Sequence, residues 1–230
     1  MTAASTPFRS PHGLWLTLLG ADALEAVPFE GVGWVGVDLQ HGRLEVADLA
    51  GILRVSPVPV LARAASQDAA HLARVLDTGV AGVIVPGVGS GQEAAALVSA
   101  VRLPPEGRRS SGLSRSALVG GPAHPLLLPM VETRGGLEAV ADIVVCDGVD
   151  GVFVGPYDLS LSLGRPSVVD EEVVAAIHHV ASTARRQGVL VGAFSADRNL
   201  DGRLPGLDLL GVDTDVTAIR LGMAQLFGAS

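Results

Sequence analysis

The chain has 230 residues, of which 48% are apolar and 3% aromatic, and it carries a formal net charge of −8 without a run of like charges. A polyanionic partner such as nucleic acid is not expected, because phosphate contacts need clustered arginine or lysine. No apolar stretch reaches the length of a membrane span, the first residues lack a signal-peptide core, and the single Cys146 excludes an intrachain disulfide. We therefore expect a soluble, cytoplasmic protein.

Short apolar runs alternate with helical patterns along the whole chain. The runs that predict strands are 14–19, 34–39, 59–63, 82–87, 126–132, 151–155, 189–194 and 209–214. Helical periodicity covers 67–78, 91–101, 135–142, 170–187 and 215–227. Eight strands alternating with helices predict an α/β fold, a closed (β/α)8 TIM barrel formed by residues 1–230 as a single domain. An open, doubly wound sheet is the alternative, although no G-x-G-x-x-G follows a strand.

One long segment between strands, 104–125, reads as irregular. Connections in compact domains are usually only a few residues long, so this length indicates a functional loop.

Four polar residues fall at the predicted carboxyl ends of strands. His41 follows the second strand, Arg63 ends the third, Glu132 ends the fifth and Asp158 follows the sixth. Because a barrel of this kind carries its chemistry at that end, we expect all four side chains to share one site. Taken singly, Asp158 is equally well explained as a helix N-cap and Arg63 as a surface ion-pair partner.

Each residue type suits a particular task. Glu132 and Asp158 offer hard oxygen ligands for Mg²⁺ or Mn²⁺. Arg63 can hold a substrate carboxylate through two parallel hydrogen bonds, and His41 can exchange a proton near neutral pH. A nearby acid, Asp38 or Asp77, would fix the tautomer of the histidine.

The chain contains no lysine, since all 16 basic residues are arginine. Schiff-base chemistry, a pyridoxal phosphate attachment site and a Walker A lysine are thereby excluded.

The motifs VDLQHG, PVLAR, VLDTGVAGVIVPGV, MVET and GVDGVFVGPYDLS, in this order, resemble the HpcH/HpaI aldolase family, and the match runs from about Trp15 to Phe227. The resemblance implies a class II, metal-dependent aldolase that reversibly cleaves a 4-hydroxy-2-oxo acid into pyruvate, or a related 2-oxo acid, and an aldehyde. Metal dependence agrees with the absence of lysine, because a lysine-dependent aldolase forms an iminium instead.

The resemblance also implies a role for each matching residue. Glu132 and Asp158 would hold a divalent cation, Mg²⁺, Mn²⁺ or Co²⁺, while Arg63 binds the substrate carboxylate. His41 would be the acid/base, paired with Asp77 within the chain or across a subunit boundary. The residues expected beside the bound carboxylate are Gly155, Pro156 and Tyr157.

The family further implies a homo-oligomer, a hexamer built as a trimer of dimers, in which the last helix, 215–227, is exchanged between subunits.

Three departures from the family pattern concern the substrate pocket. Met130 stands where a glutamine is common, Gln40 where a glutamate is common, and the loop 107–125 is short. The alternatives are a CoA-thioester lyase of the citrate lyase β-subunit or malyl-CoA lyase type, with phosphates on Arg108, Arg109 and Arg115, and an inactive binding scaffold.

Overall fold

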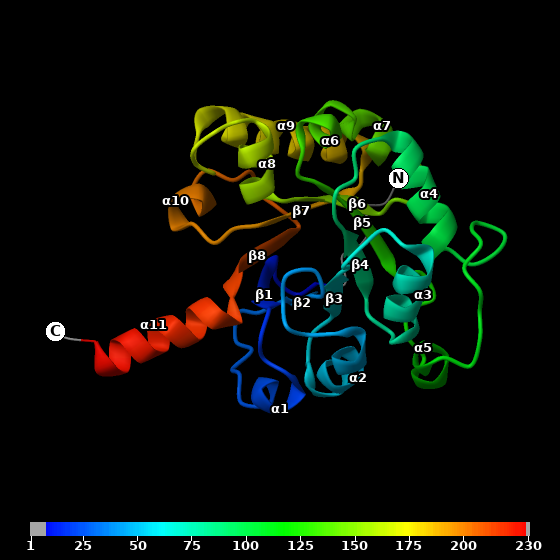
Figure 1. Cartoon of the computed structure of the whole chain (residues 1–230), viewed down its shortest axis with the longest axis horizontal. Helices are drawn as coiled ribbons and strands as arrows, with labels where there is room; N and C mark the ends of the chain where they lie inside the picture. The colour runs from blue at the N-terminus through cyan, green and yellow to red at the C-terminus, as the bar shows by residue number, and fades with distance from the viewer. Residues whose placement is uncertain (1–7, 229–230) are drawn as a thin grey trace.

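Eight parallel strands close into a barrel in the computed structural model, which describes residues 8–228 (Figure 1). Each strand pairs with its sequence neighbours, and β8 returns to β1. The strands are β1 (His12–Leu16), β2 (Trp34–Asp38), β3 (Val60–Arg63), β4 (Gly82–Val85), β5 (Leu126–Val131), β6 (Gly151–Val154), β7 (Leu190–Phe194) and β8 (Leu209–Thr214). The predicted (β/α)8 barrel is confirmed, and the open sheet is wrong.

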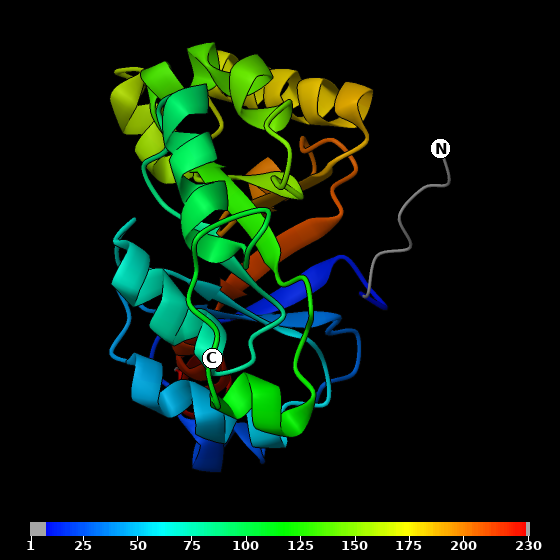
Figure 2. The same ribbon diagram turned by 90° about the vertical axis from the view of Figure 1, so that its right-hand side faces the viewer.

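Helices surround the strands, as the turned view in Figure 2 shows. The described residues form α1 (Ala21–Leu24), α2 (Val46–Val55), α3 (Ala69–Asp77), α4 (Gly91–Val101), α5 (Arg115–Val119), α6 (Arg134–Glu138), α7 (Val140–Val144), α8 (Pro156–Ser162), α9 (Glu171–Gln187), α10 (Arg198–Asp201) and α11 (Asp215–Phe227). The expected helix over 135–142 is two short helices that meet at Ala139. The segment 104–125 is not wholly irregular, because it contains α5, which Ser114 caps and Gly120 ends in the left-handed conformation.

Aromatic side chains are few, and most of them gather inside the barrel. The chain has eight aromatic residues, and five form or border one interior cluster: Phe8, Trp15, Trp34, Phe153 and Phe194. The ring of Trp15 lies 5.7 Å from that of Phe153 and 5.2 Å from that of Phe194. Gly36 makes room for this packing because it has no side chain; an added Cβ there would lie 2.5 Å from the Trp15 ring. Together with aliphatic side chains such as Leu61, Ile84 and Leu128, the large rings pack the barrel interior and form a floor beneath its carboxyl end.

The last helix, α11, projects away from the body of the barrel (Figure 1). Its large apolar side chains are exposed: Ile219, Leu221, Met223, Leu226 and Phe227. Its first residue, by contrast, is anchored, because the buried Asp215 carboxylate accepts hydrogen bonds from the backbone N–H groups of Thr17, Leu18 and Leu19. No helix within 8–228 combines the length and apolar character that crossing a membrane would require.

Candidate active site

A cavity of about 430 Å³ opens at the carboxyl ends of the strands. Six of the residues expected at the site line it: His41, Arg63, Gly155, Pro156, Tyr157 and Asp158. They come from the ends of β2, β3 and β6 and from the start of α8, where a parallel barrel places its reactive groups. The predicted strand ends therefore meet at one place in the fold.

Arg63 and Asp38 form a two-pronged ion pair at the floor of this cavity. The guanidinium donates from Nε to Asp38 Oδ1 at 3.0 Å and from Nη2 to Asp38 Oδ2 at 2.5 Å. The two residues are cross-strand partners in the register of β2 and β3, so the sheet itself brings them together. Arg63 is therefore not a surface ion-pair partner, because only 12% of its side chain and 2% of that of Asp38 are exposed.

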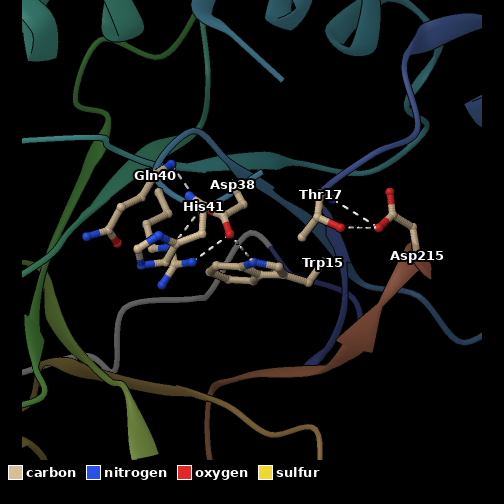
Figure 3. Close-up of polar contacts among 7 residues, drawn as sticks. Trp15, Thr17, Asp38, Gln40, His41 and Asp215 are labelled. Atoms are coloured by element: carbon tan, nitrogen blue, oxygen red, sulfur yellow. Dashed lines mark hydrogen bonds and ion pairs between the residues drawn. The ribbon is translucent and has the colours of Figure 1, made fainter. Parts of the chain in front are cut away.

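The Asp38 carboxylate also organises the loop that follows β2. Its Oδ1 accepts hydrogen bonds from the backbone N–H groups of Gln40 and His41, at 3.0 and 3.1 Å (Figure 3). Burial opposes the ionisation of Asp38, yet the guanidinium of Arg63 and these two N–H groups outweigh it and hold the pKa of Asp38 below its usual value. The carboxylate thus stays ionised near neutral pH and fixes both the arginine and the His41 backbone.

Trp15 completes the support of the arginine from the barrel interior. The guanidinium carbon of Arg63 lies 5.4 Å from the centre of the Trp15 ring, within the range of a cation–π contact. The indole Nε1 faces Asp38 Oδ2 at 3.5 Å, and Figure 3 shows the ring beside that carboxylate. Two strands and an aromatic floor therefore restrict the orientation of the guanidinium.

Glu132 directly follows β5 and is 7% exposed; it does not itself line the cavity, but it lies against Gly155, which does. One carboxylate oxygen, Oε1, accepts a hydrogen bond of 2.6 Å from the backbone N–H of Gly87. The other, Oε2, faces Gly155, where an added Cβ would lie only 2.9 Å away. Burial raises the pKa of Glu132, and the neighbouring carboxylate of Asp158 adds to the rise, against the N–H of Gly87 and the charges of Arg63 and His41.

Asp158 lies in the first turn of α8, at the third helical position. The residue at the N-cap is Gly155, so the alternative explanation of Asp158 as an N-cap is wrong. The Asp158 side chain is exposed and lines the cavity, which leaves its oxygens available to a ligand.

The pair Glu132 and Asp158 fits a divalent cation that needs further ligands from outside the chain. Two hard carboxylates from successive strand ends lie close enough for Asp158 to oppose the ionisation of Glu132, and a cation between them would relieve that repulsion. Within 8–228 no group of three or more His, Cys, Asp or Glu side chains is placed to enclose a metal. Water and substrate oxygens would therefore complete the coordination, as is usual for Mg²⁺.

Asp77 lies apart from the other expected site residues. It ends α3, and its carboxylate faces the guanidinium of Arg109 at 3.7 Å. Within one chain it therefore contacts the 107–125 loop and does not line the cavity that contains His41.

Several cavity residues were not anticipated from the sequence. The last residue of β7, Phe194, contributes to the cavity, as do Ser195, Ala196 and Asp197 in the segment that follows and Leu200 of α10. Position at a strand end is the only signal that could have indicated the first of these, because their residue types carry no catalytic pattern. Met130 also lines the cavity, so its departure from the family pattern bears directly on the substrate pocket.

A profile of the HpcH/HpaI aldolase/citrate lyase family matches residues 12–206. A hydroxypyruvate/pyruvate aldolase of Sagittula stellata is 35% identical over 223 residues, covering 90% of this chain and 88% of the relative. A 4-hydroxy-2-oxo-heptane-1,7-dioate aldolase of Klebsiella pneumoniae is 33% identical and covers 91% of this chain and 86% of its own length. An HpcH/HpaI aldolase/citrate lyase family protein of Burkholderia cenocepacia superposes with a TM-score of 0.83 at 29% identity, over 94% of this chain and 93% of that one.

Proposed function

The chain belongs to the HpcH/HpaI aldolase/citrate lyase family, and from this premise we propose that it is a class II aldolase. It is a carbon–carbon lyase that reversibly cleaves a 4-hydroxy-2-oxo acid into pyruvate, or a related 2-oxo acid, and an aldehyde. The observation that carries the proposal is a cavity lined by a fixed guanidinium, Arg63 on Asp38, and by the carboxylate of Asp158, with the carboxylate of Glu132 close to Asp158.

Arg63 binds the carboxylate of the 2-oxo acid. Two of its N–H groups are held by Asp38, and a guanidinium has five N–H donors, so donors remain for a substrate. Because Asp38 and Trp15 fix the guanidinium beforehand, little side-chain entropy is lost on binding. The backbone at Gly155, Pro156 and Tyr157 borders the same cavity.

Glu132 and Asp158 would hold the divalent cation, Mg²⁺, Mn²⁺ or Co²⁺. When bound, such a cation supplies Lewis-acid stabilisation of the negative charge that develops on the 2-oxo oxygen. Arg63 on β3, which Asp38 on the neighbouring strand β2 holds in place, orients the substrate through the carboxylate of the 2-oxo acid.

His41 handles the proton of the 4-hydroxyl group. During cleavage the C3–C4 bond breaks, C4 becomes the aldehyde carbon and its hydroxyl proton passes to the base. The His41 side chain is exposed at the cavity, on a loop whose backbone Asp38 fixes. Asp77 pairs with this histidine only if a neighbouring subunit brings it there, so its catalytic role is tied to assembly.

We also propose that the chain forms a homo-oligomer, a hexamer built from dimers whose two subunits exchange α11. This proposal is supported by the exposed apolar side chains of α11, a helix that projects away from the barrel, since such surfaces mark protein contacts.

A cytoplasmic location is proposed as well, supported by a single, half-buried cysteine.

The direct test is cleavage of 4-hydroxy-2-oxopentanoate, followed by the pyruvate released. We expect pyruvate formation that stops with EDTA and returns with Mg²⁺, Mn²⁺ or Co²⁺. Glu132→Gln should abolish it, whereas Glu138→Gln, on the exposed end of α6, should leave it intact. Full activity in Glu132→Gln would refute the assignment, and turnover by neither protein would favour a binding scaffold.

A further inference from the structure

The part of the cavity beyond the charged groups is apolar, and it comes from two segments late in the chain. Val168, in the connection between α8 and α9, and Leu200 of α10 line it together with Phe194 and Ala196. From these residues we infer that the acceptor is an uncharged aldehyde with an aliphatic chain. This inference rests on the proposed aldolase function and concerns the second substrate of the same site.

The charges around the cavity disfavour a second carboxylate. Among the described residues that line it, the basic side chains are His41 and Arg63. Arg63 is held by Asp38 and serves the carboxylate of the 2-oxo acid, and His41 serves the hydroxyl proton. An acceptor bearing its own carboxylate would give up water without gaining a cation, and this desolvation is unfavourable.

An acidic group adds repulsion at the same cavity. Asp197 lines it next to Ala196, and its Oδ1 is fixed by a hydrogen bond of 2.8 Å from the backbone N–H of Asn199. An anionic tail on the aldehyde would meet this charge, whereas an alkyl tail would not.

Met130, which also lines the cavity, acts in the same direction. Met130 is 2% exposed, and its methyl group lies against Gly155, where an added Cβ would be 3.1 Å from Met130 Cε. A thioether offers neither of the strong hydrogen-bonding groups of an amide and fills irregular apolar space well. Met130 and the apolar residues that line this part of the pocket therefore favour alkyl groups.

The reaction used as a test is aldol addition. Pyruvate C3 loses a proton, the resulting enolate carbon forms a bond to the aldehyde carbon, and the aldehyde oxygen takes up a proton, so atoms and charge balance. Two aldehydes of nearly equal shape would be compared in the presence of Mg²⁺: 4-methylpentanal and 4-oxobutanoate, in which a carboxylate replaces the isopropyl group. We expect kcat/KM for 4-methylpentanal to be at least tenfold higher.

A single substitution should reverse this preference. Ala196 is exposed at the cavity, and Ala196→Arg places a cation beside the apolar wall. It should raise kcat/KM for 4-oxobutanoate at least tenfold, while Ala196→Gln, of similar length but uncharged, should not. An unchanged ratio in Ala196→Arg would overturn the claim that the missing cation sets the preference.

Exchange of the pyruvate methyl protons with deuterium oxide separates the donor chemistry from the choice of acceptor. It needs no aldehyde, so it reports on the donor half-reaction alone. Suppose that the methyl protons exchange but the enzyme prefers 4-oxobutanoate, or adds pyruvate to neither aldehyde. Either result would overturn the acceptor inference and leave the proposed donor chemistry in place. Absence of exchange would overturn both.

Discussion

Replacing Arg63 by alanine should weaken the fold as well as the binding of the 2-oxo acid. The substitution leaves the Asp38 carboxylate, 2% exposed, without its guanidinium partner. Removing one member of a buried ion pair costs about 3–5 kcal/mol. Asp38 keeps hydrogen bonds from the N–H groups of Gln40 and His41, so we expect the loss of unfolding free energy at the lower end of that range, about 3 kcal/mol.

The matched control is an ion pair on the surface. Arg165 pairs with Glu172, and both side chains are 42% exposed, so Arg165→Ala should cost less than about 1 kcal/mol. Guanidinium chloride unfolding, followed by tryptophan fluorescence, would give both values. The double variant Asp38→Asn, Arg63→Ala should recover part of the stability lost in Arg63→Ala, because it no longer buries an unpaired charge.

Activity gives an independent reading of the same variant. Arg63→Ala should lose at least 100-fold in kcat/KM for the 2-oxo acid, since a charge-assisted pair to a carboxylate contributes on the order of 3 kcal/mol. If the Arg63→Ala protein were as stable as the Arg165→Ala protein and kept the kcat/KM of the unsubstituted protein, Arg63 would have no role in stabilising the fold or in binding the 2-oxo acid.

Three further substitutions test other parts of the site and the fold. Gly155→Ala places a Cβ 2.9 Å from Glu132 Oε2, so it should lower metal affinity, measured by calorimetry with Mn²⁺, whereas Gly20→Ala meets nothing within 4 Å and should not. His41→Ala should impair aldol cleavage more than pyruvate proton exchange; equal losses would mean that the histidine also acts at C3. Hydrogen bonds from the surrounding N–H and O–H groups outweigh burial and lower the pKa of Asp215, so its stabilisation is present above about pH 4 and is lost as pH falls. Asp215→Asn should therefore show a smaller drop in melting temperature between about pH 5 and pH 3, and parallel melting profiles would contradict this.

The strands were readable from the sequence because parallel strands buried on both faces form continuous apolar runs. All five residues of β2 are buried, for example, and the predicted 34–39 matches Trp34–Asp38 closely. The placement of His41, Arg63 and Asp158 at one cavity followed from the rule that strand ends in a barrel converge.

Register and short helices were not readable in the same way. The sequence offers Asp38 as a partner for His41, but the alignment of β2 with β3 sets it opposite Arg63, and no local pattern encodes that alignment. The helix α8, which carries Asp158, has only seven residues, too few for a clear periodicity. The link between Asp215 and the loop after β1 spans almost the whole chain and is visible only in the folded barrel.

The decisive experiment for the proposed aldolase chemistry is exchange of the pyruvate methyl protons in deuterium oxide, followed by NMR, with Mg²⁺ and then with EDTA. We predict exchange that requires the cation and disappears in Glu132→Gln. Absence of exchange with each of Mg²⁺, Mn²⁺ and Co²⁺, or exchange that persists in EDTA, would contradict a metal-dependent enolate at this site.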